Sequence, residues 1–420
     1  MGTYAALHGA NLTSYDVLTS DGWLLGVHRV QNMEIFDPKL STPVLLCHGF
    51  AAASFDYLSN RRNESLGFLL ADQGYDVWMI NFRANRFSNR KMTSDRTITP
   101  PTPEDYLRVS FQYMAERDIP AVVDKILEET EQDAIYAVGY SMGGTSMFAM
   151  LSENHKYDDK ILHFVALAPV LRTGPDASFK TRTLFSIAPA ITFLMSAKSV
   201  FTTFFGRQIL STASLSDFDS TSSTECQMFP LLCQAFLNMV IITQPGLGYS
   251  HLASLRNGIR SSMIPSGFTL MTAYHFTQGY SRGNLAKLDF RSIPQSGIRN
   301  IDEYGSDEPP VYDIGGVRVN YSVIFTTNDM ISGVQTAKKV IDYLNIEPEN
   351  YKLVNDFTHL DVIWGWDSRC WIFDDIVERF NNIEMTRGQE RIEYRGRAVA
   401  YVESLNLENN CDQIVASGES

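Results

Sequence analysis

Residues 134–146 read AIYAVGYSMGGTS, a run of strand formers that ends in a glycine-rich turn and leads into a helical stretch. The centre of this segment, GYSMG at residues 139–143, has the G-x-S-x-G pattern of a nucleophile elbow. Glycines on both sides of the serine keep Cβ atoms out of a turn whose backbone is strained. The turn lifts the serine hydroxyl above the sheet and aims the first amides of the next helix at a reacting carbonyl. We therefore predict that Ser141 is a nucleophile rather than an inert serine in a strand-to-helix turn.

Strands and helices alternate on both sides of this elbow. The sequence predicts a hairpin over 14–30 that turns at Asp21-Gly22, and a helix over 118–131 that Asp118 caps. Further strands are predicted at 43–48, 75–82, 161–168, 317–325 and 351–354, and further helices at 332–344 and 371–381. Such alternation predicts an α/β fold with a mostly parallel central sheet and helices on both of its faces.

The alternation stops between residues 172 and 311, where Ser, Thr, Phe, Met and Gly are frequent and no strand rhythm is clear. We interpret 172–311 as an inserted, mainly helical cap or lid. It divides the α/β core into an N-terminal part, 1–171, and a C-terminal part, 312–385. Residues 386–420 are polar, and we expect them to form a loose tail outside the catalytic fold.

The composition indicates an acidic globular protein. The 420 residues include 35 basic and 48 acidic side chains, and the net charge of −13 without a basic stripe argues against nucleic-acid binding. No apolar stretch is long enough to span a membrane, and residues 1–17 show no signal peptide, so we expect a soluble or peripheral protein. Cys226 and Cys233 lie close enough in sequence for one local disulfide, whereas Cys47, Cys370 and Cys411 are expected to be solitary.

A serine nucleophile needs a base, and the base needs an acid that orients it. On a fold of this kind the acid and the base follow the serine in the chain, each on a loop after a late strand. Asp329 lies just past the predicted strand at 319–325, and His359 lies just past the one at 351–354. His359 is also the only one of eight histidines that follows the acid candidate. The sequence therefore predicts a triad of Ser141, Asp329 and His359.

Alternatives to the acid stay open at this point. Asp329 could instead cap the helix that begins near Ser332, and Asp356 or Asp361 could supply the carboxylate. Both of these aspartates lie so close in sequence to His359 that orienting its ring from the far side is harder. We therefore favour Asp329.

Two backbone amides are predicted to form an oxyanion hole. One belongs to the residue after the nucleophile, Met142, and the other to a loop after an early strand. The strand at 43–46 ends in Cys47-His48-Gly49-Phe50, which makes Phe50 the expected second donor. His48 precedes the serine in the chain, and we expect it to support this loop by hydrogen bonding rather than to act as the base.

The predicted reaction is acyl transfer to water. Ser141 would attack an ester carbonyl while His359 takes its proton, and water activated by His359 would then release the acid from the acyl-enzyme. The chain has no zinc-ligand spacing, Walker loop or nucleotide fingerprint, so we expect neither a cofactor nor a metal site.

From about Gly9 to Phe380 the chain resembles the acid lipases, the group that contains gastric lipase and lysosomal acid lipase. The stretches that carry the resemblance are, in order, SYDVLTSDGWLLGVHRV, LLCHGFAAASFDY, DVWMINFRANRFSNR, SFQYMAERDIPAVVDKILEET, AVGYSMGG, LAPV, NDMISGVQTAKKV and THLDVIWGWD. The resemblance implies an α/β-hydrolase fold with a helical cap and ester hydrolysis on triacylglycerols or sterol esters. It also implies the triad Ser141, Asp329 and His359, with Phe50 and Met142 around the oxyanion hole. This family commonly has GHSQG where the chain has GYSMG, so Tyr140 and Met142 replace His and Gln.

The expected partner is a lipid ester at a lipid–water interface. Apolar side chains crowd the cap over 185–205 and 231–241, and any that stay exposed would let a lid lie on lipid and open over Ser141. The resemblance implies a lysosomal or secreted protein, whereas the absence of a visible signal peptide leaves an intracellular or lipid-droplet location open. A carboxylesterase, peptidase or acyltransferase with the same triad is the second hypothesis, and a catalytically dead lipid-binding module is the third.

Overall fold

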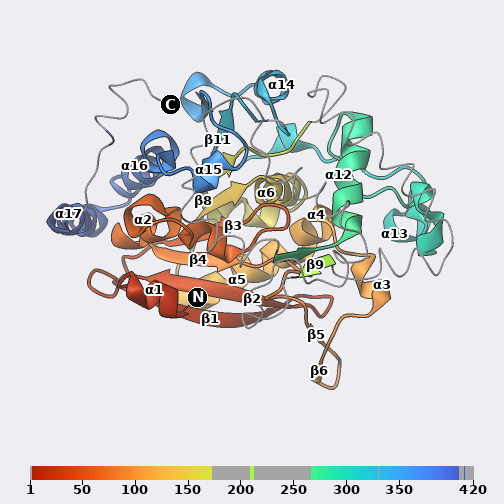
Figure 1. The fold of residues 1–420 in the computed structure, drawn as a ribbon, viewed down its shortest axis with the longest axis horizontal. Helices are drawn as coiled ribbons and strands as arrows, with labels where there is room; N and C mark the ends of the chain where they lie inside the picture. The colour runs from red at the N-terminus through yellow and green to blue at the C-terminus, as the bar shows by residue number, and fades with distance from the viewer. Residues whose placement is uncertain (1, 173–208, 212–265, 330, 406–410, 412–420) are drawn as a thin grey trace.

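An eight-stranded sheet forms the centre of the computed structural model (Figure 1). The structure describes residues 2–172, 209–211, 266–329, 331–405 and 411. The three strands β1, β2 and β4 pair antiparallel, and all neighbours from β4 to β12 pair parallel. The prediction of a mostly parallel sheet is therefore confirmed. In spatial order the strands are β1 (Asn11–Leu18), β2 (Leu24–Gln31), β4 (Asp76–Ile80), β3 (Pro43–Cys47), β7 (Ile135–Tyr140), β8 (Ile161–Leu167), β11 (Tyr321–Thr326) and β12 (Tyr351–Val354).

The central strands bury both of their faces, which explains why their sequences are almost continuously apolar. Along β3, Val44 and Leu46 pack on one face of the sheet. Leu45 and Cys47 pack on the other face. Helices α2 (Leu66–Asp72) and α16 (Asp374–Glu384) cover the first face. The second face is covered by α5 (Ile119–Thr130), α6 (Met142–Glu153) and α14 (Val334–Leu344).

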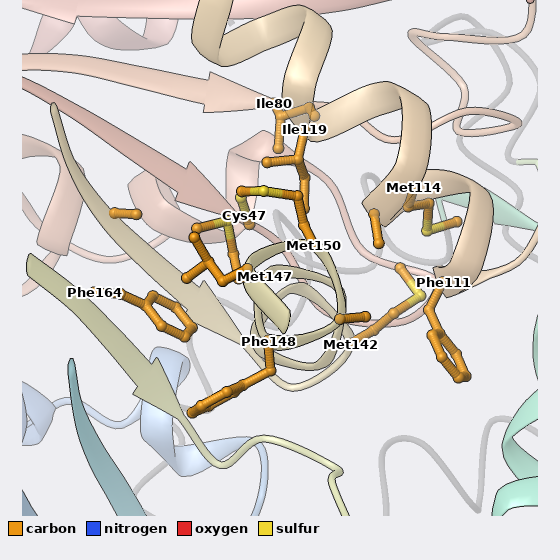
Figure 2. Close-up of a cluster of buried hydrophobic side chains, with 14 of the residues drawn as sticks. Cys47, Ile80, Phe111, Met114, Ile119, Met142, Met147, Phe148, Met150 and Phe164 are labelled. Carbon is orange, nitrogen blue, oxygen red and sulfur yellow. The ribbon is translucent and has the colours of Figure 1, made fainter. Parts of the chain in front are cut away.

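The helix after the elbow is anchored in the core of this second face. Figure 2 shows Met147, Phe148 and Met150 of α6 within a cluster that also holds Cys47 of β3 and Phe164 of β8. All five side chains are at most 2% exposed. Burying a side chain of this size stabilises a fold by about 1.5–3 kcal/mol relative to leaving it in water. The packing therefore holds α6, and with it the elbow, firmly against the sheet.

The prediction that Asp118 caps the helix at 118–131 is wrong. A π-helical turn at Met114–Asp118 leads directly into α5, so no helix start needs a cap at Asp118. The Asp118 carboxylate instead lies 2.7 Å from the fully buried guanidinium of Arg83 and accepts the Arg83 amide at 3.0 Å. Arg83 also pairs with Asp21 at the tip of the predicted β1–β2 hairpin, 2.8 Å away. A buried cation requires such partners, because an unpaired charge in the core is costly.

Only part of the expected cap, 172–311, belongs to the described residues. That part includes the helices α12 (Leu270–Arg282) and α13 (Asn300–Tyr304). It also includes a short antiparallel pair, β9 (Ile209–Ser211) and β10 (Ser266–Phe268), which the sequence did not predict because three-residue strands leave no readable alternation. The Ser266 amide donates to the carbonyl of Ala51 at 2.8 Å, so the returning cap segment is bonded to the loop after β3. The apolar segments and the cysteine pair Cys226 and Cys233 lie outside the described residues.

The expectation of a loose tail at 386–420 is wrong for the residues that the structure describes. Helix α17 (Gln389–Ser404) packs beside α2 and α16, and its Tyr394 and Arg395 are 1% and 2% exposed. The Tyr394 hydroxyl donates to the carbonyl of Gly74 at 2.9 Å, and the Arg395 guanidinium donates to the carbonyl of Gln73 at 2.6 Å. Polar side chains of α17 therefore hold this segment in place by donating hydrogen bonds to main-chain oxygens of the core.

The tail is also tied to the core by a disulfide. Cys370 and Cys411 are bonded across a sequence separation of 41 residues, so the expectation that both are solitary is wrong. Cys47 is free and buried, as expected. The bond closes a loop that contains α16 and α17.

The remaining described elements are short. None of the described helices is both long and apolar enough to cross a membrane. The short helices and strands are α1 (Gly2–Leu7), β5 (Lys91–Met92), β6 (Ile98–Thr99), α3 (Pro103–Tyr106), α4 (Phe111–Tyr113) and α15 (Asp361–Trp364).

Candidate active site

Ser141 lies at the point where the chain turns from β7 into α6. Its backbone has φ 51° and ψ −115°, a conformation that a non-glycine residue rarely adopts. The Ser141 amide donates to the carbonyl of Leu167 at 2.8 Å, and the Ser141 carbonyl accepts the Thr145 amide at 3.0 Å. These bonds to β8 and to the first turn of α6 hold the strained residue in place.

The glycines of the elbow permit a close approach that no side chain would allow. A Cβ atom on Gly143 would lie 2.2 Å from the carbonyl oxygen of Cys47 at the end of β3. A Cβ atom on Gly139 would lie 2.7 Å from the backbone of Gly144. The start of α6 therefore lies directly against the end of β3, which is the contact that an elbow requires.

The structure brings the three predicted triad residues together. Nε2 of His359 lies 2.8 Å from Oγ of Ser141, and Nδ1 of His359 lies 2.7 Å from Oδ2 of Asp329. Ser141 is the N-cap of α6, Asp329 follows β11, and His359 follows β12. The carboxyl ends of three strands of one parallel sheet thus supply all three side chains. Their catalytic roles stay a prediction.

Asp329 is buried and held by a set of donors that the sequence reasoning missed. Its Oδ1 accepts the amides of Ile331 and Ser332 at 2.7 and 3.0 Å, and its Oδ2 accepts the Ser332 hydroxyl at 2.5 Å. Burial raises the pKa of Asp329, but His359 and the hydrogen bonds from His359 and Ser332 outweigh burial, so this pKa lies below its ordinary value. An aspartate followed three residues later by serine is the local signal that could have predicted this turn.

The two competing aspartates, Asp361 and Asp356, lie beside other hydrogen-bonding groups. The Asp361 carboxylate accepts the amide and the hydroxyl of Thr358 at 2.8 and 2.6 Å. Asp356 is exposed and lies 3.5 Å from the Asn328 side-chain amide. Asp361 therefore shapes the loop around the base, in a Thr-x-x-Asp pattern that resembles a helix-capping box.

The two predicted oxyanion donors lie on neighbouring segments. Met142 is the first residue of α6, where main-chain amides have no acceptor within the helix, while its side chain packs into the core (Figure 2). Phe50 follows the end of β3, and its ring lies 4.8 Å from that of Phe268 in β10. A narrow cavity of about 10 Å³ is lined by both Phe50 and Met142. The participation of their amides in an oxyanion hole stays a prediction.

His48 supports the loop that carries Phe50. Its Nε2 accepts the Phe82 amide at 3.1 Å, so Nδ1 carries the proton and donates to the carbonyl of Gly49 at 2.8 Å. Burial lowers the pKa of His48 to about 4. The histidine is therefore neutral and fully hydrogen-bonded, which agrees with the expectation that it is not the base.

A larger cavity of about 400 Å³ lies near the opposite end of α6. Its lining is charged and includes Glu116, Glu153 and Lys287, with Lys287 paired to both glutamates at 2.9 and 3.1 Å. Such a lining does not suit a long acyl chain, and none of the predicted site residues contributes to it. We therefore place the candidate site at the elbow.

Comparisons with known proteins agree with this fold. A model of the alpha/beta hydrolase fold matches residues 42–220, and a model of a partial alpha/beta-hydrolase lipase region matches residues 1–61. Lipase member K and gastric triacylglycerol lipase of Homo sapiens are each 29% identical over 367 residues, which cover 86% of the chain and 86% of each relative. Lysosomal acid lipase/cholesteryl ester hydrolase of Rattus norvegicus is 28% identical over 368 residues, 86% of the chain and 87% of the relative. The chain is therefore similar to the acid lipases over most of its length.

This similarity to lipases confirms the resemblance found in the sequence. The chain is accordingly an enzyme of the lipase and carboxylic ester hydrolase class. The crystal structure of an epoxide hydrolase from Vigna radiata, 13% identical, superposes with a TM-score of 0.50 over 89% of the chain and 99% of that structure. This likeness supports the α/β-hydrolase fold alone.

Buried histidines should make this protein less stable in acid. Burial lowers the pKa of His28, His48 and His163 to about 4 and that of His275 to about 3, against 6.5 for an exposed histidine. The unfolded chain binds more protons below pH 6.5, so stability is lost as the pH falls from 6.5 towards 4. At pH 5 each such histidine should cost about 2 kcal/mol relative to pH 7.

Denaturant unfolding at pH 7 and pH 5 measures this loss for a single residue. We expect His163→Gln to reduce the pH-dependent loss by about 2 kcal/mol, because glutamine can keep a bond to Ser322, 3.0 Å from Nε2 of His163, without titrating. His155→Gln is the control, since the His155 side chain is 41% exposed. If His163→Gln lost as much unfolding free energy between pH 7 and pH 5 as the wild type, His163 could not be a buried neutral imidazole.

Proposed function

We propose that this chain hydrolyses carboxylic esters of neutral lipids, triacylglycerols or sterol esters, through Ser141, His359 and Asp329. The observation that carries the proposal is the continuous line of hydrogen bonds, 2.8 Å from Ser141 Oγ to His359 Nε2 and 2.7 Å from His359 Nδ1 to Asp329 Oδ2. A hydroxyl, an imidazole and a buried carboxylate in this order are the arrangement that activates a serine.

The first half of the reaction forms an acyl-enzyme. Ser141 Oγ attacks the ester carbonyl carbon while its proton moves to His359 Nε2, and Asp329 stabilises the imidazolium through the Nδ1 proton. The carbonyl oxygen becomes an oxyanion, which we expect the amides of Met142 and Phe50 to stabilise. The C–O bond then breaks, and the alcohol leaves with the proton from His359.

The second half returns the enzyme to its resting state. Water gives a proton to His359 Nε2 and attacks the acyl carbon, and a second oxyanion forms. Its collapse breaks the bond to Ser141 Oγ, which takes the proton back from His359, and the carboxylic acid is released. No cofactor or metal takes part in these steps.

Neutral lipid substrates are supported by the relatives. Gastric triacylglycerol lipase and lysosomal acid lipase/cholesteryl ester hydrolase are named for such esters, and each aligns with 86% of this chain. The aromatic contact between Phe50 and Phe268 beside the elbow also favours an apolar acyl group over a polar one.

A comparison of substrates tests the proposal. The purified chain should hydrolyse emulsified long-chain triacylglycerol or cholesteryl ester, as well as a soluble short-chain ester, across a range of pH. The same protein inactivated by a fluorophosphonate provides the background rate. Turnover of the soluble ester alone would instead indicate a carboxylesterase, and preferential transfer of the acyl group to an added alcohol would indicate an acyltransferase.

A further inference from the structure

Tyr140, the last residue of β7, connects the nucleophile to the base through its side chain. Its hydroxyl donates to the main-chain carbonyl of His359 at 2.9 Å, and the centre of its ring lies 5.3 Å from that of the imidazole. The side chain is only 4% exposed. Tyr140 is adjacent to Ser141 in the chain, so a single residue bridges the elbow and the loop of His359.

The loop between β12 and α15, which carries His359, needs a contact that fixes its position. Residues 355–360 form no helix or strand, and His359 must keep its ring within hydrogen-bond reach of two other loops. The Asn328 amide donates to the carbonyl of Phe357 at 3.1 Å, and Thr358 donates to Asp361. These bonds hold the residues before His359, whereas the Tyr140 hydroxyl holds the main chain of His359 itself.

The Tyr140 ring also lies against the loop after β3. A Cβ atom on Gly49 would lie 2.9 and 3.0 Å from two ring carbons of Tyr140, so the ring fills the space beside that glycine. Gly49 immediately precedes Phe50, the expected oxyanion donor. The ring therefore lies close both to the loop that carries Phe50 and to the loop that carries His359, so its position can affect both.

The hydroxyl keeps its proton under all conditions in which the enzyme would work. Burial raises the pKa of Tyr140 well above its ordinary value, and the nearby carboxylates of Asp56, Asp329 and Asp361 raise it further. Tyr140 is therefore a permanent donor to the His359 carbonyl.

We propose that Tyr140 is a positioning residue that sets the distance and orientation of His359 relative to Ser141 through the hydrogen bond to the His359 carbonyl. This inference rests on the proposed function, because it assigns to His359 the role of the base. Misplacement of a catalytic group by a fraction of an ångström lowers turnover without weakening substrate binding.

The test compares Tyr140→Phe with a matched control on the same strand. Tyr136 lies on the same face of β7 and is also buried, but its hydroxyl donates to Glu384 at 2.9 Å, away from the triad. Each Tyr→Phe change removes one buried hydroxyl and its bond. Because Glu384 is a charged acceptor, Tyr136→Phe should lose at least as much stability as Tyr140→Phe. The readouts are kcat and KM for a soluble ester, with active sites counted by a fluorophosphonate, and the melting temperature.

We expect kcat per titrated site to fall roughly tenfold in Tyr140→Phe with KM nearly unchanged, and to stay near the wild-type value in Tyr136→Phe. Wild-type turnover per site in Tyr140→Phe would overturn the proposal, even if fewer sites were titrated because the variant is less stable. Equal losses in both variants would also overturn it, because they would reflect any buried hydroxyl. A wild-type protein that neither labels nor hydrolyses an ester would overturn the proposed function itself, and Tyr140 would then have no base to position.

Discussion

Replacing Ser141 with alanine is expected to lower kcat by about 10⁶-fold, to a rate near the background. The change removes the Oγ atom that lies 2.8 Å from Nε2 of His359, so no acyl-enzyme can form. The strained backbone at φ 51° is set by the elbow and not by the hydroxyl, so the fold should persist. The measurements are kcat on a soluble ester and the mass of the protein after reaction with a fluorophosphonate.

A second serine on the same helix provides the control. Ser152 is buried near the end of α6, and its hydroxyl donates to the carbonyl of Ala149 at 2.9 Å. Ser152→Ala should keep near-wild-type turnover and should still take up the label. Labelling of Ser141→Ala, or a rate well above background, would mean that another side chain is the nucleophile.

The sheet and the triad could be predicted because each rests on a signal that is local in sequence. Strands buried on both faces are nearly continuous apolar runs, as in β3 and β7, and the glycines around Ser141 reflect contacts within one turn. Parallel strands bring their carboxyl ends to one edge of the sheet. The positions of Asp329 and His359 just after two late strands were therefore enough to predict that they would meet Ser141.

The tail could not be predicted, because its contacts connect residues far apart in sequence. Tyr394 and Arg395 bond to main-chain oxygens more than three hundred residues earlier, and nothing in the polar composition of 386–420 indicates such acceptors. The pairing of Cys370 with Cys411 is equally invisible, since cysteine spacing alone does not determine connectivity. Asp118 was misread for the same reason, because its partner Arg83 lies 35 residues earlier, in the turn after β4.

The contacts that surround the triad could be predicted only in part. The Thr358-x-x-Asp361 turn has a capping-box pattern that could have been recognised, whereas the bond from Tyr140 to the carbonyl of His359 joins residues 219 apart. That Ser141, Asp329 and His359 would meet could be inferred from their order along the chain. What holds the triad at working distance depends on packing between loops, which only the structure describes.

Replacing Asp329 with asparagine is expected to lower kcat by about 10⁴-fold while the geometry persists. Oδ1 accepts two main-chain amides, from Ile331 and Ser332, so the amide oxygen of asparagine must occupy that position. Its NH₂ group then replaces Oδ2, 2.7 Å from Nδ1 of His359, where it can only donate.

That donation forces the histidine into the wrong tautomer. Nδ1 of His359 must then accept, the proton moves to Nε2, and Nε2 can no longer take the proton of Ser141. The measurement is kcat on a soluble ester, with folding checked by thermal unfolding. Asp356→Asn, at an exposed site, is the matched control and should keep near-wild-type turnover. A large loss in Asp356→Asn together with normal turnover in Asp329→Asn would show that the orienting acid has been assigned to the wrong aspartate.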